Sequence, residues 1–202
     1  MDQVAAATAL ARRDPVVRGL RRRYGPPEFP APARPALRFA ALAESIVFQQ
    51  LHGRAAATIH GRLVARLGGR VTPQAVLATP IEDLRACGLS ASKAAAIVDL
   101  ADHAASGRLG LSTVARRSDD DVVAHLTQVR GVGVWTAEMF LMFTLGRLDV
   151  WPVGDYGVRN GYARAWGLDR TPTAKELAPM GDAFRPYRSV AAWYCWRVMD
   201  VG

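Results

Sequence analysis

The chain has 202 residues, half of them apolar, which is enough for one substantial core or for two small subdomains that share one. Lys and Arg outnumber Asp and Glu by 26 to 18, and the net charge of +8 indicates a polyanionic partner, most commonly nucleic acid. A generally Arg-rich proteome would explain the charge equally well. Cys87 and Cys195 form no CxxC pair, which excludes a zinc finger and a four-cysteine iron–sulfur cluster.

Targeting signals are not evident. The start of the chain lacks the charged and apolar segments of a signal peptide, and the apolar run at 139–145 is too short to span a bilayer. We therefore expect a cytoplasmic protein, associated with the nucleoid if it is bacterial.

The N-terminal half reads as helices separated by proline and glycine. Residues 3–23 form one or two helices broken at Asp14-Pro15, and the proline-rich 25–35 is extended. The basic cluster of Arg18 and 21–23 is either a solvated helix face or a DNA contact. Further helices are expected at 37–50, at 54–67, and from Ser90 or Ser92 to about Ser106. Two short helices should follow Thr72-Pro73 and Thr79-Pro80, where each threonine hydroxyl caps a helix that begins with proline.

The centre of the chain pairs two helices around a glycine turn. Ser118 followed by three aspartates is typical of a helix N-terminus, and that helix should end near Gln128. Gly131 and Gly133 can adopt backbone angles closed to other residues. A second helix is expected from Val134 to Gly146, and its exposed N–H groups suit a phosphate.

The C-terminal third continues the helical pattern after the sharp corner that ends at Asp155. Helices are expected at 156–166, after a capping box at 173–176, and at 188–201. Gly157 and Gly161 lie four apart on one face, which permits close approach of another helix or of DNA. Because no alternating strand pattern occurs and helix caps recur throughout, the chain is predicted to be all-α.

Four blocks of sequence carry a family resemblance over roughly residues 36–199. They are FQQL at 48–51, GVGVWTA at 131–137, LGRLDVWPVGDYGVRNG at 145–161 and RPYRSVAAWYCWR at 185–197. Four ordered blocks are far stronger evidence than an isolated GxG. The chain resembles the DNA-3-methyladenine glycosylase II family, within the helix–hairpin–helix DNA glycosylase superfamily.

This resemblance implies a fold and an activity. The fold is a single domain over 1–202, all-α, with two helical subdomains, a hairpin motif at about 118–146 and an active-site cleft between the subdomains. The activity is that of a monofunctional DNA glycosylase in base excision repair. It flips an alkylated purine such as 3-methyladenine or 7-methylguanine out of double-stranded DNA and hydrolyses its N-glycosidic bond. The protein is expected to act as a monomer, and no membrane is expected among its partners.

The resemblance also implies roles for residues that contact DNA. Leu51 is the wedge that fills the gap left by the flipped base, with Gln50 beside it, although packing of Leu51 in the core is the alternative. The hairpin binds a phosphate through backbone N–H groups around Gly131, Gly133 and Val134. His52 replaces the usual serine, and Arg130 replaces a proline or small residue.

The same family places the catalytic carboxylate at Asp155. A carboxylate near the anomeric carbon stabilises the positive charge that develops on the sugar by about 4 kcal/mol at about 4 Å, which is roughly a thousandfold in rate. The alternative role of Asp155 is the N-cap of the helix that follows it. Both roles are compatible if the side chain changes partners when DNA binds.

An alkylated purine is cationic or electron-poor and binds well over aromatic faces. By resemblance Trp135 and Trp196 line the base pocket, and Tyr156 and Trp193 are further candidates on aromatic character. Core packing is a substantial alternative for Trp193 and Tyr194. A cationic base leaves readily, so no general acid is required.

Cofactor and lysine chemistry follow from the same comparison. Bifunctional relatives carry a Schiff-base lysine where this chain has Trp135, and neither Lys93 nor Lys175 falls on the motif, so hydrolysis by water is expected. No iron–sulfur cluster is expected. A monovalent cation at the hairpin would be held by the main-chain carbonyls of Thr127, Val129 and Val132.

Two other functions remain open at this point. One is a non-catalytic DNA-binding module built on the same hairpin, against which Asp155 and the aromatic set argue. The other is a glycosylase for mispaired or oxidised bases, whose members typically carry the cluster or the lysine that this chain lacks.

Overall fold

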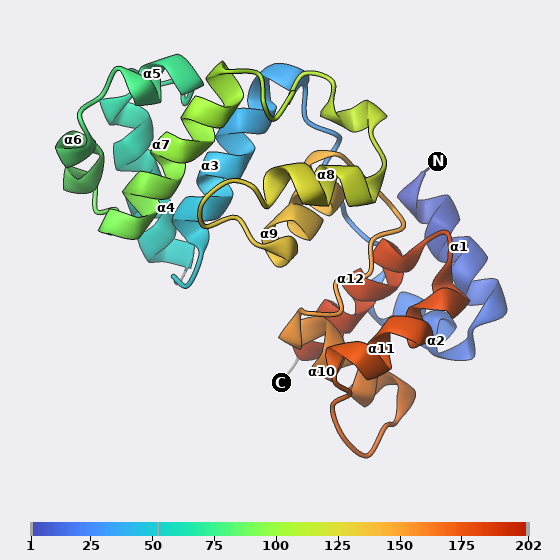
Figure 1. Ribbon diagram of the computed structural model, residues 1–202. Helices are drawn as coiled ribbons and strands as arrows, with labels where there is room; N and C mark the ends of the chain where they lie inside the picture. The colour runs from blue at the N-terminus through green and yellow to red at the C-terminus, as the bar shows by residue number, and fades with distance from the viewer. Residues whose placement is uncertain (1, 52, 201–202) are drawn as a thin grey trace. The chain divides into compact units, whose positions relative to one another are not determined.

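The computed structural model describes residues 2–51 and 53–200, and these residues form helices and loops without a β-strand (Figure 1). The all-α prediction is therefore confirmed. The chain divides into two compact units, Pro32–Phe140, which we call the central unit, and Met1–Ala31 with Leu141–Gly202, which we call the terminal unit. His52, where the chain departs from the family pattern, lies outside the described residues.

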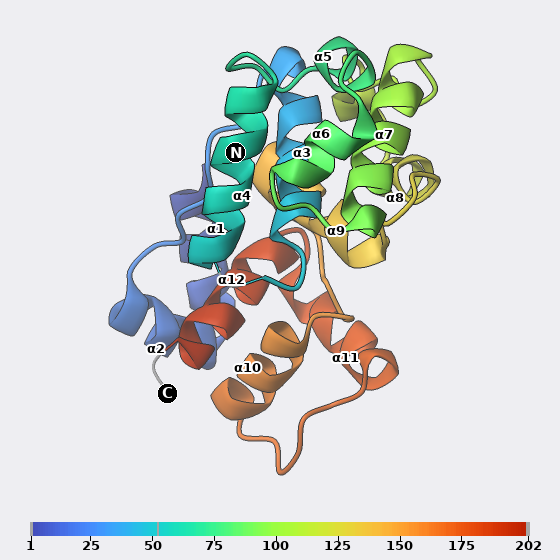
Figure 2. The same ribbon diagram turned by 90° about the vertical axis from the view of Figure 1, so that its left-hand side faces the viewer.

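The central unit is built around α7, which packs against α3, α5 and α6. Helices α3 and α7 run side by side in both views (Figures 1 and 2). Its core is made of fully buried aliphatic side chains such as Leu42, Ile46, Ile97 and Leu100. The elements are η1 (Pro35–Leu37), α3 (Arg38–Phe48), α4 (Gly53–Arg66), α5 (Pro73–Leu77), α6 (Ile81–Ala86), α7 (Ala91–Ala105), η2 (Val114–Arg116), α8 (Asp119–Leu126) and α9 (Val134–Met139).

The terminal unit joins both ends of the chain around α12, which contacts α1, α2 and α10. A Cβ placed on Gly161 would lie 2.0 Å from the backbone oxygen of Cys195, so α10 and α12 touch at a point where only glycine fits. The predicted close approach is thus made to a helix. The elements are α1 (Gln3–Arg13), α2 (Pro15–Tyr24), α10 (Tyr156–Trp166), α11 (Ala174–Met180), η4 (Gly181–Phe184) and α12 (Arg188–Met199).

Two helix predictions were wrong in detail. Thr79 was expected to cap the helix after it, but its hydroxyl donates to the carbonyl of Ala75 at 2.8 Å, and α6 begins at Ile81 without a side-chain cap. The helix expected at 134–146 is α9 followed by a π-helical turn, η3 (Phe140–Thr144), before Gly146 ends it at φ +70°. A π turn is wider than an α turn, and propensity alone does not reveal it.

Candidate functional site

The helix before the hairpin, α8, has the predicted N-cap. The Ser118 hydroxyl accepts from the backbone N–H of Asp121 at 3.2 Å and starts α8. Gly131 has φ +75°, and a Cβ there would lie 3.2 Å from the Cβ of Ala96, so both conformation and space call for glycine.

Gly133 differs from the prediction. It is the N-cap of α9 with φ −92°, an angle open to any residue, and a Cβ built on it would have nothing within 4 Å. Neither backbone strain nor packing within the protein explains glycine here. A Cβ at this position would stand in open space.

Large apolar side chains are exposed around this hairpin. Val134 is 56% exposed, Trp135 is 46% exposed and Leu51 is 39% exposed. Apolar groups gathered on one surface are typical of an interaction site. For Leu51, this exposure favours the wedge over packing in the core.

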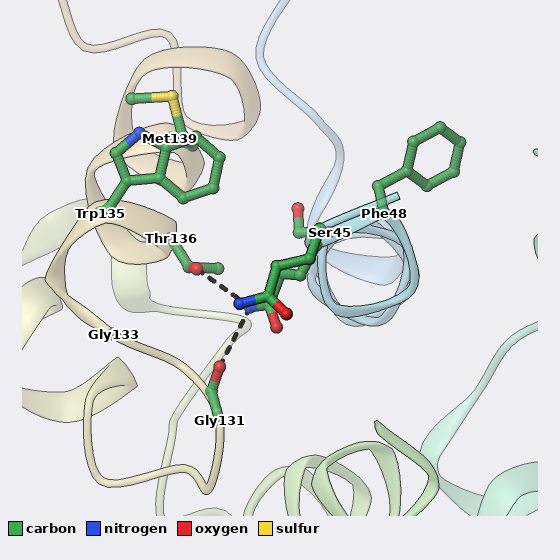
Figure 3. A pocket seen from close by; sticks show the side chains of 9 residues that line it. Ser45, Phe48, Gly131, Gly133, Trp135, Thr136 and Met139 are labelled. Atoms are coloured by element: carbon green, nitrogen blue, oxygen red, sulfur yellow. Dashed lines mark hydrogen bonds between the residues drawn. The ribbon is translucent and has the colours of Figure 1, made fainter. Parts of the chain in front are cut away.

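A cavity of about 480 Å³ lies beside the hairpin, within the central unit. Trp135 and Met139 of α9 lie on one side and Ser45 of α3 lies on the other (Figure 3). The Gln49 amide donates to the carbonyl of Gly131 at 3.0 Å and to the Thr136 hydroxyl at 3.2 Å. A mostly apolar cavity with a few polar groups is the common form of a small-ligand site.

The Asp155 corner belongs to the terminal unit. The backbone N–H of Asp155 donates to the carbonyl of Pro152 at 3.0 Å, which closes a tight turn. The carboxylate Oδ1 accepts from the Val158 N–H at 2.8 Å and from the Trp196 indole Nε1 at 2.9 Å. The N-cap role is therefore real, and Trp196 is joined to the carboxylate by a direct hydrogen bond.

Gly157 makes this arrangement possible. A Cβ at Gly157 would lie 2.9 Å from Cδ1 of Trp196 and 3.1 Å from Oδ1 of Asp155. A side chain there would separate the indole from the carboxylate. The corner thus depends on one small residue in the first turn of α10.

The other aromatic candidates differ in exposure. Tyr156 is 63% exposed, with the guanidinium of Arg159 5.9 Å from its ring centroid. Trp193 is only 8% exposed, and the Arg197 guanidinium lies 5.1 Å from its ring centroid. Burial favours the core interpretation for Trp193.

Tyr194 is fully buried in the same helix, α12. Its hydroxyl donates to the carbonyl of Gly25 at 2.9 Å, and burial raises the pKa of this phenol to about 12. Tyr194 is therefore a core residue that ties α12 to the segment after α2.

The two lysines lie in different units. Lys175 is exposed on α11. The Lys93 Nζ donates to the main-chain carbonyls of Val47 at 2.8 Å and Gln49 at 2.6 Å, and burial lowers the pKa of this amine. These partners are more than 40 positions away in the chain, so no local pattern in the sequence indicates a role for Lys93.

Arg130 departs from the family pattern but is held in place. Its backbone N–H donates to Oδ2 of Asp99 at 2.8 Å, which fastens the hairpin to α7. Thr127, Val129 and Val132 lie in the loop after α8, where a cation would meet the negative end of the helix dipole. The carbonyl of Val129 also accepts from the Val132 N–H at 3.1 Å and retains a second lone pair.

No described helix is long and apolar enough to cross a membrane. The described residues contain no group of three or more His, Cys, Asp or Glu side chains that could hold a metal ion.

Comparisons with known proteins place most of the chain in one family. A model for the HhH-GPD superfamily base excision DNA repair proteins matches residues 43–180. DNA-3-methyladenine glycosylase 1 of Schizosaccharomyces pombe is 35% identical over 159 residues, which are 77% of this chain and 70% of that protein.

Two solved structures share the fold. The S. pombe 3-methyladenine DNA glycosylase (Mag1) in complex with abasic DNA has a TM-score of 0.83 and 31% identity, covering 96% of this chain and 95% of its own. A DNA-3-methyladenine glycosidase from Bacillus halodurans has a TM-score of 0.85 and 35% identity, covering 95% of this chain and 88% of its own.

Proposed function

Because the chain belongs to the HhH-GPD superfamily of base excision DNA repair proteins, we propose that it is a monofunctional DNA glycosylase for alkylated purines. Its substrate is double-stranded DNA that carries a base such as 3-methyladenine or 7-methylguanine. The observation that carries the proposal is the Asp155 corner, where a carboxylate in a closed turn accepts from a backbone amide and an indole.

The reaction breaks the bond between C1′ of the sugar and the base nitrogen, and the bonding electron pair leaves with the base. Positive charge develops on the sugar, and the Asp155 carboxylate stabilises it electrostatically. Water then adds at C1′ and loses a proton, which leaves an abasic site and the free base. A base that is already cationic needs no proton from the protein in order to leave.

The corner prepares Asp155 for this role. Two donors on Oδ1 fix the carboxylate before substrate arrives, so the charge needs little reorganisation when the sugar cation forms. Hydrogen bonds from Val158 and Trp196 come from α10 and α12, which pack tightly at Gly161. A charge held by rigid helices is aimed more precisely than one on a loose loop.

DNA contacts follow from the exposed surface of the central unit. Leu51 enters the stack as a wedge beside Gln50, and the amides around Gly131, Gly133 and Val134 bind a phosphate. For the flipped base we propose stacking on aromatic rings, with the exposed Trp135 and Tyr156 and the half-buried Trp196 as candidates. Trp193 is buried, so it is a candidate for structural support rather than for stacking. We further propose a monovalent cation, without an iron–sulfur cluster, on the carbonyls of Thr127, Val129 and Val132.

Hydrolysis by water rather than by a lysine follows from the sequence at the hairpin, where Trp135 stands in place of the Schiff-base residue. Borohydride treatment of the protein with its DNA product tests this directly. A trapped covalent protein–DNA species would contradict the monofunctional assignment.

Base release from three labelled duplexes tests the function: methylated DNA, DNA with an oxidised guanine, and DNA with a mismatch. We expect free methylated purines from the first substrate and little release from the other two. Preferential release of oxidised or mispaired bases would replace the substrate class. Binding to all three duplexes without base release would instead identify a non-catalytic DNA-binding module.

A further inference from the structure

The turn that carries Gln50 and Leu51 is held by contacts that the proposed chemistry does not use. Helix α3 ends at Phe48, and Gln50 is the one non-glycine residue in the described chain with a positive φ, +55°. Such a conformation is disfavoured for a residue with a Cβ and persists only where the surroundings impose it. The turn that presents the wedge therefore needs an external support.

Packing on one side of the turn is incomplete. A pocket of about 230 Å³ opens beside it, lined by Gln50, Leu51, Ile59 and Lys93 among others. The hydrogen bond within the turn, from the Leu51 N–H to the carbonyl of Phe48, is 3.3 Å long. Because the pocket offers few contacts on that side, hydrogen bonds from outside the turn are needed to support its conformation.

Lys93 supplies such bonds. Its ammonium donates to the carbonyls of Val47 and Gln49, at 2.8 and 2.6 Å, at the end of α3 where helix carbonyls lack partners within the helix. A cation at a helix C-terminus is also favoured by the helix dipole. Lys93 thus binds the backbone on the N-terminal side of Gln50.

Gln49 extends the link to the hairpin. Its main-chain carbonyl accepts from Lys93, while its side-chain amide donates to Gly131 and Thr136 (Figure 3). A single residue therefore joins the wedge turn to the segment that is proposed to bind a phosphate.

Helix α7 holds the hairpin as well. Ala96 makes the close approach to Gly131, and the Asp99 carboxylate accepts from the backbone of Arg130. Lys93, Ala96 and Asp99 are three residues apart in turn, so they lie along one face of α7. One face of α7 therefore contacts both the turn at 49–51 and the hairpin at 130–133.

We propose that Lys93 is a positioning residue for base flipping, which sets the wedge turn at 49–51 in a fixed relation to the hairpin at 130–133. It acts through Leu51 and touches neither the base nor the sugar. This inference rests on the proposed glycosylase function. It assigns to one of the two lysines a role distinct from Schiff-base chemistry.

The test compares K93M with K175M, which removes the other lysine from an exposed site on α11. Methionine keeps much of the aliphatic stem and loses the three donors. The substrates are a duplex with one paired 7-methylguanine and the same strand with the base in a mismatch bubble. We expect K93M to lower single-turnover release from the paired duplex about tenfold, as loss of charge-assisted hydrogen bonds implies, and from the bubble less than about twofold. K175M should change neither rate.

A double-mutant cycle with L51A separates positioning from simple stabilisation. If Lys93 acts through the wedge, K93M should add little to the loss on paired duplex that L51A already causes. The proposal is overturned if the losses of rate in K93M and L51A multiply fully in the double variant. It is also overturned if K93M loses rate equally on the paired and bubble substrates. Fluorescence of 2-aminopurine beside the lesion should show reduced flipping in K93M alone and no change in K175M.

If K93M does not fold, Q49M tests the same link, because it removes the two donors to the hairpin and leaves Lys93 in place. The same pattern of paired and bubble rates is expected, and unchanged paired rates would contradict the proposal. Failure of the proposed function is distinguishable, since the unmodified protein would then release base from neither substrate.

Discussion

The chain turns at Asp14 and at Asp155 with the same residue types but for different purposes. Both aspartates are helix N-caps in the terminal unit, and each accepts from a backbone N–H three residues later and from a tryptophan indole. At Asp14 the two donors reach different oxygens: Val17 N–H binds Oδ1 and Trp166 Nε1 binds Oδ2. At Asp155 the Val158 N–H and the Trp196 indole both bind Oδ1.

The difference begins with one residue in each helix. The second position after Asp155 is Gly157, where a Cβ would collide with Trp196, whereas the matching position after Asp14 is Val16. The missing side chain lets the Trp196 indole reach the oxygen that also caps α10. A capping motif thus becomes a candidate catalytic site through its neighbours, and the motif by itself does not distinguish the two corners.

The largest effect is expected from D155N. Asparagine keeps one oxygen, and because both described donors share Oδ1, both bonds can survive the change. The lost negative charge should lower base release about a thousandfold, with DNA binding retained. Single-turnover assays on methylated DNA, thermal melting and binding titrations measure the three quantities. Near-normal turnover would leave Asp155 with a structural role like that of Asp14.

W196F is expected to have the next largest effect on the rate of base release. Phenylalanine keeps an aromatic ring and removes the donor to Asp155, so we expect about a tenfold loss of rate from a less well fixed carboxylate. W166F, which removes the matching donor to Asp14, is the control and should leave the rate unchanged. Equal rates in the two variants would show that the indole bond to Asp155 serves stability alone.

G157A should have a smaller effect of the same kind. The added Cβ would lie 2.9 Å from Cδ1 of Trp196, so the indole must shift, although its donor is not removed. We expect a loss of rate of about fivefold. G19A in α2 is the control, because a Cβ there meets nothing within 4 Å and alanine should stabilise the helix by about 1 kcal/mol without a change in rate.

D14N should have the smallest effect, confined to stability. Its donors reach two oxygens and asparagine has only one, so either the cap or the Trp166 bond is lost. A loss of about 1 kcal/mol in the free energy of unfolding should lower the melting temperature by about 2–4 °C. The rate should not change, and a strong fall in base release would mean that the two corners are not functionally distinct.

Much of the helical framework was predictable because its signals are local. Ser118 and Thr173 each accept from an N–H three positions later, and both are predicted as helix starts. Asp14 also caps a helix, although the sequence predicts only a break at Asp14-Pro15. The wrong predictions also concern single residues. Thr79 carries the pattern of a cap but bonds backwards to α5, and Gly133 has the residue type of a strained turn without the angle.

The candidate site was predictable only in part. Asp155, Trp196 and Leu51 were named through the family resemblance, and the exposure of Leu51 now favours its surface role. The roles of Lys93 and Gln49 could not be predicted in the same way. Neither residue lies in a motif that marks it, since their importance comes from partners elsewhere in the chain.

Most helices, most of their caps and the turn at Gly131 are predictable, because they depend on interactions between residues three or four positions apart. The folded core was needed to show that Trp196 meets Asp155 across 41 positions and that Lys93 meets Gln49 across 44. Such contacts arise when packed helices bring distant side chains to one point, and the geometry of that packing is a property of the whole core. No local pattern of residues encodes it.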